Sequence, residues 1–376
     1  MNSTQNDWLH GVDDVQLMLR LTQTSVPTLP NKLEADGQQL QKASEEMRTA
    51  IDQAYGKAFV VIVFSNKERV AGPVDQLEGR FPGIGEMARI IGVEYHGHML
   101  HDSSRVFVVD APKSLGGYRF RVTAEQTLDQ RILCIRKERP TLWPLKSLLK
   151  DYTDFFLKEI LYANLNNGEK SPTPVNGGVI LIIGEPNSGK TTLAASLIHE
   201  WMQRVPITAI TLERNQDYRM PDFIDNGSLC LQLDISNRNP REVFERSVLT
   251  MSHDLLFFGE ILQEEDAGIV IDAASSGKTV IATFHGKSIP SGLDRLVRKI
   301  KGKETEEVAR EIVSDVLRWV IRVTPAHGSG GRSVQYQPVA FTQMVKTAWS
   351  TGDAAMEDAM RKAGALWRKQ ETQNTR

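Results

Sequence analysis

From residue 178 onward, short runs of consecutive apolar residues alternate with segments in which apolar residues recur every three or four positions. Continuous apolar runs are typical of strands buried on both faces, and the three-to-four spacing is typical of amphipathic helices. Their alternation predicts an α/β domain with a mainly parallel sheet and helices on both faces. The predicted strands are 178–183, 207–213, 228–235, 254–261 and 279–285, and the predicted helices are 190–203, 240–252, 264–277, 291–301 and 304–317.

Ahead of this domain, the pattern predicts a smaller unit of a different kind. Apolar and partly alternating segments predict strands at 58–64, 105–109, 118–122 and 131–135, with a short helix at 86–91. Residues 46–140 are therefore expected to form a small α+β domain. The first 45 residues are polar and are expected to be an extension. Two prolines, Pro140 and Pro144, indicate a linker at about 139–147 that leads into the second domain, 141–376.

Composition restricts the possible partners and compartments. The 376 residues include 45 basic and 47 acidic side chains, for a net charge of −2, so no direct binding to nucleic acid is expected. Cys134 and Cys230 both lie inside apolar runs, which predicts two buried free thiols. The first residues lack the features of a signal peptide, and no apolar run approaches the roughly 18 residues that span a bilayer. A cytoplasmic protein, or one held peripherally at a membrane, is expected.

The segment GEPNSGKTT, residues 184–192, directly follows the apolar run 178–183. It fits the pattern G-x-x-x-x-G-K-[ST], with a strand before it and a helix after it, which is the setting in which this motif binds a nucleoside triphosphate. Lys190 is expected to reach the β- and γ-phosphates, and Thr191 to bind Mg²⁺ through its hydroxyl. The residues expected to contact nucleotide are Gly184, Glu185, Pro186, Asn187, Ser188, Gly189, Lys190, Thr191 and Thr192.

Three titratable residues stand at the ends of other predicted strands. Glu260 follows the apolar run 255–258, Glu213 ends the strand at 207–213, and His285 ends the strand at 279–285. Because parallel strands end at one edge of a sheet, all three are expected beside the phosphates. Glu260 and Glu213 are expected to act on the attacking water or the metal, and His285 to sense the γ-phosphate. The alternatives are a solvated glutamate and a structural histidine.

The order of the segments GEPNSGKTT, TLERNQDY, LLFFGEILQ and AASSGKTVIATFHG resembles the secretion ATPase superfamily, which serves pili, type II secretion and conjugation-type (type IV) secretion. The resemblance implies a RecA-like P-loop ATPase domain preceded by a small α+β, PAS-like N-terminal domain. Carried over by position, it implies ATP and Mg²⁺ as cofactors, with Lys190 and Thr191 as their ligands, Glu213 and Asp217 as Asp-box acids, Glu260 as the Walker B glutamate and His285 as the His-box histidine.

The resemblance further implies how such a chain works. Arginines of the N-terminal domain contact nucleotide in the family, and the matching positions here are Arg119, Arg121 and Arg136. The family acts as hexameric rings, so a homohexamer is implied, docked on the cytosolic face of an inner-membrane platform with pilus or secretion proteins as partners. Pilus retraction, pilus assembly, type II secretion and conjugation share these boxes, and the sequence leaves the choice among them open.

Departures from the family's boxes leave a second function open. Arg214 and Asn215 replace the second acid and the proline of the Asp box, and Leu262 and Gln263 replace the arginine and aspartate of the Walker B box. The arginine at 214 reverses the charge beside the predicted metal site, which would retune hydrolysis or place a cation near the γ-phosphate. The alternative to a hexameric motor is thus a catalytically weak or inactive ATP-binding paralogue that scaffolds or regulates such a machine. The lack of an aromatic and basic stripe weighs against a nucleic-acid motor.

Overall fold

The computed structural model divides the chain into two compact units, Met1–Pro140 and Thr141–Arg376. The structure describes residues 16–22, 49–50, 55, 58–63, 69–101, 106–112, 118–126, 130–138, 142–149, 160, 177–302, 305–328 and 331–362. Among these residues, no helix combines the length and the apolar character that crossing a membrane requires.

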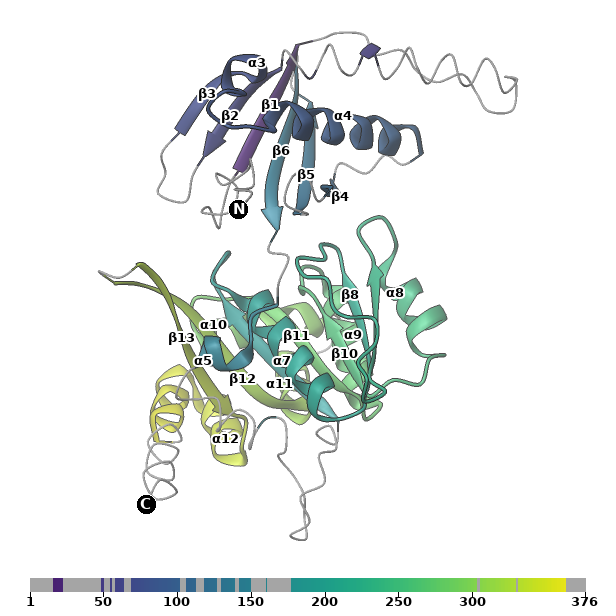
Figure 1. Ribbon diagram of the computed structural model, residues 1–376. Helices are drawn as coiled ribbons and strands as arrows, with labels where there is room; N and C mark the ends of the chain where they lie inside the picture. Colours follow the sequence, from purple (N-terminus) through teal and green to yellow (C-terminus); the bar gives the residue numbers. More distant parts are fainter. Residues whose placement is uncertain are drawn as a thin grey trace. The chain divides into compact units, whose positions relative to one another are not determined.

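The first unit contains a six-stranded antiparallel sheet in the order β3-β2-β1-β6-β5-β4 (Figure 1). Helix α4 packs on this sheet because its buried residues, including Ile84 and Ile91, join one apolar cluster with Val60, Phe120 and Leu133 of the strands. The elements are β1 (Gln16–Thr22), β2 (Phe59–Val63), β3 (Arg69–Pro73), α3 (Val74–Leu77), α4 (Ile84–His101), β4 (Val106–Asp110), β5 (Arg119–Gln126) and β6 (Gln130–Glu138).

The sequence predicts a polar extension through residue 45, but Gln16–Thr22 forms β1, which lies between β2 and β6 in the sheet. Leucines at 17, 19 and 21 alternate with Met18 and Arg20, a period of two that is typical of a strand. The average polarity of the first 45 residues obscures this short segment. Most of the predicted extension lies outside the described residues.

The prediction of two buried thiols is correct for Cys230 and wrong for Cys134, which is exposed. Its neighbours on β6, Leu133 and Ile135, are buried. Successive side chains of a strand point to opposite faces, so Cys134 faces away from the apolar cluster that contains its neighbours. Burial, together with the nearby acidic charges, raises the pKa of the Cys230 thiol to about 12, which keeps this thiol protonated.

The second unit is built on a seven-stranded sheet in the order β13-β12-β7-β11-β10-β8-β9. All neighbouring strands run parallel except β12 and β13, which form an antiparallel hairpin. The strands are β7 (Gly178–Gly184), β8 (Thr208–Glu213), β9 (Leu229–Asp234), β10 (Leu255–Phe258), β11 (Thr279–His285), β12 (Leu317–Gly328) and β13 (Gly331–Ala340). The predicted α/β fold with a mainly parallel sheet is confirmed.

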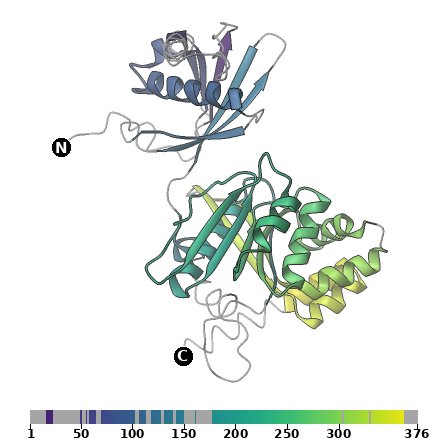
Figure 2. The same ribbon diagram turned by 90° about the vertical axis from the view of Figure 1, so that its right-hand side faces the viewer.

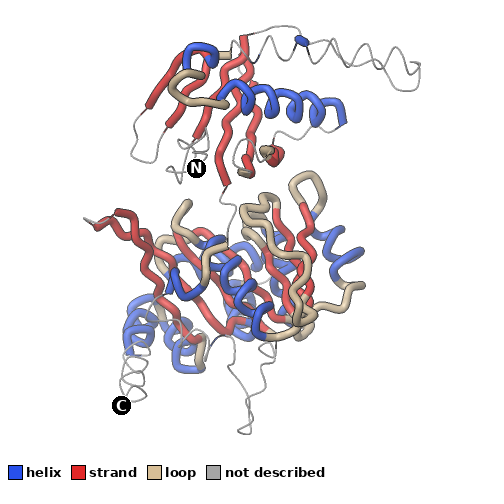
Figure 3. Tube along the Cα trace, viewed as in Figure 1, coloured by secondary structure: helices blue, strands red, loops and turns tan. Residues whose placement is uncertain are grey.

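Helices cover both faces of this sheet (Figures 2 and 3). The side chains of β7 divide between the two faces because they alternate along the strand. Ile180 and Ile182 join the apolar cluster of α7, whereas Leu181 and Ile183 join the cluster of α9 to α12. The helices are α5 (Leu145–Leu149), α7 (Lys190–Arg204), α8 (Pro240–Val243) with the π-helical turn η4 (Phe244–Val248), α9 (Glu264–Ser275), α10 (Ile289–Lys301), α11 (Glu306–Val316) and α12 (Gln343–Thr351).

Candidate functional site

The loop between β7 and α7 has the backbone of an anion-binding turn. Asn187 and Gly189 have positive φ angles of 59° and 103°, which turn the chain tightly before α7 begins. A Cβ at Gly184 would lie 2.5 Å from the carbonyl oxygen of Val323, so only glycine fits there. Gly189 is the N-cap of α7 and supplies no side chain to cap it, which leaves the positive end of this helix available to an anion.

Lys190 begins α7 and is folded back over the loop. The residue is only 6% exposed, and its ammonium group donates a hydrogen bond of 2.8 Å to the carbonyl oxygen of Glu185. The same Nζ lies 3.3 Å from Nδ1 of His285. Burial removes water from the ammonium group and lowers the pKa of Lys190, while the negative charge of Glu260 acts in the opposite direction. A bound phosphate would stabilise the charged form of Lys190, which burial disfavours.

The sheet brings the three titratable residues of the strand ends to the edge that carries the loop. Strands β7, β11, β10 and β8 are consecutive neighbours, and Gly184 pairs in register with His285. The Nε2 atom of His285 contacts Oε1 of Glu260. An ammonium group can only donate, so Nδ1 accepts from Lys190, and Nε2 is left to donate to Glu260. Nδ1 also lies 3.4 Å from the carbonyl oxygen of Gly184, with which it makes no hydrogen bond while it accepts from Lys190. Glu260, His285 and Lys190 thus form one chain of polar contacts that ends at the loop.

Glu213 lies at the same edge but is more deeply buried, at 4% exposure. Its Oε1 accepts a hydrogen bond of 3.4 Å from the Gln232 side chain. A Cβ at Gly259 would come within 3.0 Å of Cγ of Glu213, so the backbone just before Glu260 runs directly against this side chain. The two glutamates therefore occupy adjacent positions at the edge of the sheet.

Arg214 has a partner that the sequence did not predict. Its guanidinium group makes a bidentate ion pair with Asp266, with Nη2–Oδ1 at 2.7 Å and Nη1–Oδ2 at 3.1 Å. Asp266 is the third residue of α9 and forms a capping box with Gln263. That spacing, Gln263 followed three residues later by Asp266, is a helix-start pattern that points to the role of Asp266. No local pattern in the sequence points from Asp266 to Arg214.

The remaining predicted residues are distributed over both units. Thr191 lies in the first turn of α7, and the hydroxyl of Thr192 lies 2.7 Å from that of Tyr218. Arg121 and Arg136 are cross-strand neighbours on β5 and β6. These two arginines belong to Met1–Pro140, and the loop belongs to Thr141–Arg376, so their contact with nucleotide stays a prediction.

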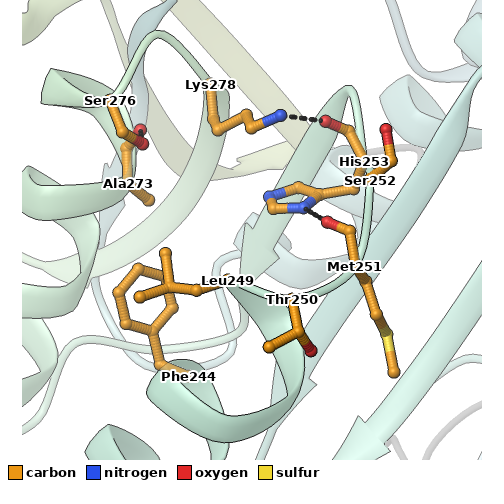
Figure 4. A pocket seen from close by; sticks show the side chains of 9 residues that line it. All are labelled: Phe244, Leu249, Thr250, Met251, Ser252, His253, Ala273, Ser276 and Lys278. Atoms are coloured by element: carbon orange, nitrogen blue, oxygen red, sulfur yellow. Dashed lines mark hydrogen bonds between the residues drawn. The ribbon is translucent and has the colours of Figure 1, made fainter.

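A pocket lies at the opposite edge of this sheet, where β10 and β11 begin (Figure 4). The imidazole ring of His253 projects into this pocket, above the side chains of Phe244 and Leu249. Nδ1 of His253 lies 2.9 Å from the carbonyl oxygen of Met251, and Lys278 donates a 2.7 Å hydrogen bond to the carbonyl oxygen of His253. Burial, aided by the charge of Lys278 and opposed by the Met251 hydrogen bond and Asp254, lowers the pKa of His253.

His253 is expected to make the folded state less stable at acidic pH. Its pKa is lowered in the folded protein, so below about pH 6.5 the unfolded chain binds a proton that the folded chain excludes. The stability that His253 provides is therefore complete above that pH and is lost as pH falls, by at most about 1.4 kcal/mol per pH unit. Urea unfolding at pH 8, 7, 6 and 5 should show a steeper loss for wild type than for His253→Gln. At pH 8 the histidine is neutral in both the folded and the unfolded chain, so the difference between the two proteins at that pH serves as the reference. An equal loss of unfolding free energy in both proteins as pH falls would contradict the role of His253.

Comparisons with known proteins agree with the geometry. The family described as Type II/IV secretion system protein matches residues 172–350. The type IV pilus retraction ATPase PilT of Pseudomonas aeruginosa is 27% identical over 188 residues, 47% of this chain and 51% of that protein. A twitching motility protein of Neisseria gonorrhoeae is 26% identical over 164 residues, 43% of this chain and 42% of that protein. The chain thus spans about half, or less, of the length of these relatives.

Solved structures share the fold. The ATPase DotB of Legionella pneumophila has a TM-score of 0.61 and 17% identity, covering 90% of this chain and 92% of that chain. The pilus retraction motor PilT with bound ADP also has a TM-score of 0.61, with 19% identity and 84% of each chain covered. The RecA-like fold predicted from the sequence is confirmed.

Proposed function

Residues 172–350 belong to the type II/IV secretion ATPase superfamily, and from this premise we propose that the chain is a motor ATPase. It hydrolyses ATP and couples hydrolysis to a type IV pilus or to a type II or conjugation-type secretion machine at the inner membrane. The working form is a homohexamer, attached peripherally to the cytosolic face through an inner-membrane platform and secretion or pilus proteins. No direct contact with nucleic acid is required.

The contact chain Lys190–His285–Glu260 beside the loop carries this proposal. Several features of the loop fit a triphosphate. The hydroxyl oxygen of Ser188 is buried and has no hydrogen-bond partner among the described residues, and Gly184 admits no side chain. Lys190 is a buried cation, and burial favours an anionic partner for it. These are the properties of a site completed by phosphate oxygens.

Each residue of the site has a separate role in the proposed reaction. Lys190 binds the β- and γ-phosphates, and this contact draws its ammonium group away from His285. Without Lys190 as the donor to its Nδ1, the ring of His285 is free to turn an N–H group toward the γ-phosphate and so to sense it. Glu260 accepts a proton from the attacking water or orients that water, and Glu213 orders it from the adjacent strand end. Thr191 would hold Mg²⁺ through its hydroxyl, and the metal would supply positive charge to neutralise the phosphates.

One observation favours a second candidate function, an ATP-binding paralogue that scaffolds or regulates such a machine. Arg214 and Leu262 replace an acid of the Asp box and an arginine of the Walker B box, and the structure uses Arg214 in an ion pair with Asp266. In this alternative, nucleotide binding stabilises an assembly, and hydrolysis is slow or absent.

Mg²⁺-dependent ATP hydrolysis, measured together with the mass of the particle in solution, tests the proposal. A motor is expected to turn over at about 1 s⁻¹ or faster and to form a particle near six subunits when nucleotide is present. Tight ATP binding without turnover would reject the motor and favour the scaffold. Absence of nucleotide binding would reject both functions.

A further inference from the structure

We propose that Arg214 and Asp266 form a positioning ion pair that holds the Glu260 loop in its catalytic conformation. The inference rests on the proposed hydrolysis, because positioning matters only if Glu260 acts on the attacking water. Arg214 directly follows Glu213, and Asp266 lies in the first turn of α9, so the pair joins the segment carrying one glutamate to the segment that follows the other.

The Asp266 carboxylate binds the backbone amides that follow Glu260. Its Oδ2 accepts hydrogen bonds from the amide N–H groups of Leu262, at 2.8 Å, and Gln263, at 2.9 Å. Both carboxylate oxygens also receive the guanidinium group of Arg214. The Nη1 atom of Arg214 further reaches the carbonyl oxygen of Glu260 itself, at 3.5 Å. The pair therefore contacts the Glu260 loop directly through its backbone, without touching the Glu260 carboxylate.

Other hydrogen bonds also hold this loop, so the contribution of Arg214 is limited to one part of it. Gly259 donates to the carbonyl oxygen of Leu212 at 2.9 Å, and Ile261 donates to that of Thr283 at 3.0 Å. These bonds anchor the loop to the neighbouring strands on each side of Glu260. Loss of Arg214 would leave these bonds in place, together with the hydrogen bond from Lys299 to the carbonyl oxygen of Leu262. It would loosen mainly the Asp266 carboxylate and the two amides that this carboxylate holds, which moves Glu260 slightly without unfolding the edge.

The burial of Asp266 requires a cation beside it. The Asp266 side chain is 0% exposed, whereas that of Arg214 is 25% exposed. An isolated buried carboxylate is strongly unfavourable, and a bidentate guanidinium group compensates it better than a single ammonium group does. Asp266 thus explains why position 214 carries an arginine. Three of the positions at which this chain departs from the family's boxes, 214, 262 and 263, meet at this carboxylate.

Arg214→Lys is the first test, because lysine keeps the charge but lacks the fork that reaches both oxygens of Asp266 and the carbonyl of Glu260. We expect kcat for ATP hydrolysis to fall about tenfold or more, with the dissociation constant for ADP within about threefold of wild type. Arg241→Lys is the matched control. Arg241 also ties another element to α9, through Asp272 at 2.6 Å, and this substitution is expected to leave kcat unchanged.

A second variant avoids an unpaired buried charge. Arg214→Met combined with Asp266→Asn removes both charges and keeps an acceptor for the amides of Leu262 and Gln263, so it should remain folded. Glu260→Gln is then introduced into wild type and into this variant. If Arg214 acts through Glu260, the substitution should cost at least about 100-fold in wild type and less than about tenfold in the variant. A full 100-fold loss in both backgrounds would overturn the proposal.

Hydrogen–deuterium exchange separates failure of this inference from failure of the proposed function. The amides at 262 and 263 should exchange about tenfold faster in Arg214→Lys than in wild type or in Arg241→Lys. Unchanged exchange would overturn the positioning role whether or not the protein hydrolyses ATP. A wild-type protein without turnover, but with faster exchange in Arg214→Lys, would reject the motor and leave an ion pair that holds the loop without catalysis, which also overturns the positioning role.

Discussion

Replacing Glu260 with glutamine is expected to lower kcat for ATP hydrolysis by a factor of about 100 or more. Glutamine keeps the size of the side chain and a hydrogen-bonding group for His285, but it cannot accept a proton from water. Affinity for ATP should stay within about threefold of wild type, because Glu260 does not belong to the phosphate loop. Single-turnover hydrolysis and equilibrium binding of ATP measure the two quantities separately.

Glu264→Gln is the matched control for this substitution. Glu264 is exposed and begins α9, four residues after Glu260, so it carries the same charge change away from the phosphate loop. The contact of Glu260 with His285 is about one-third exposed, at 34% and 31% for the two side chains, so its loss should change stability by less than about 1 kcal/mol. Full activity in Glu260→Gln would exclude Glu260 as the catalytic carboxylate, whereas a matching loss in Glu264→Gln would point to a general effect of charge.

Lys190→Met is expected to weaken nucleotide binding by about 10- to 100-fold, because hydrogen bonds from a charged group contribute about 1.5–3 kcal/mol. The same substitution should preserve or raise the melting temperature of the nucleotide-free protein. Burial already disfavours the charged form of Lys190, and methionine fills similar space without that penalty. Binding and stability should therefore change in opposite directions.

Thermal unfolding with and without ATP checks both halves of this prediction. Wild type should gain stability from ATP by ligand linkage, and Lys190→Met should gain little at the same concentration. Lys278→Met provides the control, because Lys278 also donates to a backbone carbonyl oxygen but lies at the opposite edge of the sheet. A large ATP-induced stabilisation retained in Lys190→Met would show that this lysine does not hold the phosphates.

The sequence by itself determined the parts of the protein that depend on neighbouring residues. The loop from Gly184 to Lys190 could be predicted because the strand, the turn and the helix are contiguous. The position of Glu213, Glu260 and His285 at one edge followed from a general property, that parallel strands end together. Their contacts still required the strand order, which places β11 between β7 and β10 and so brings His285 between Lys190 and Glu260.

Only the tertiary structure decided the features that depend on distant pairing. Strand β1 owes its place to β6, more than 100 residues later in the chain, and a short apolar alternation within a polar segment does not reveal such a partner. The exposure of Cys134 depends on which face of the first sheet is covered, which no apolar run specifies. Arg214 and Asp266 are 52 positions apart, and a buried carboxylate can take its cation from any segment that folding brings near. Local hydrogen bonding and chain geometry act between sequence neighbours, whereas burial and charge compensation act through space. Only the folded chain determines which residues lie close enough to bury or to compensate one another.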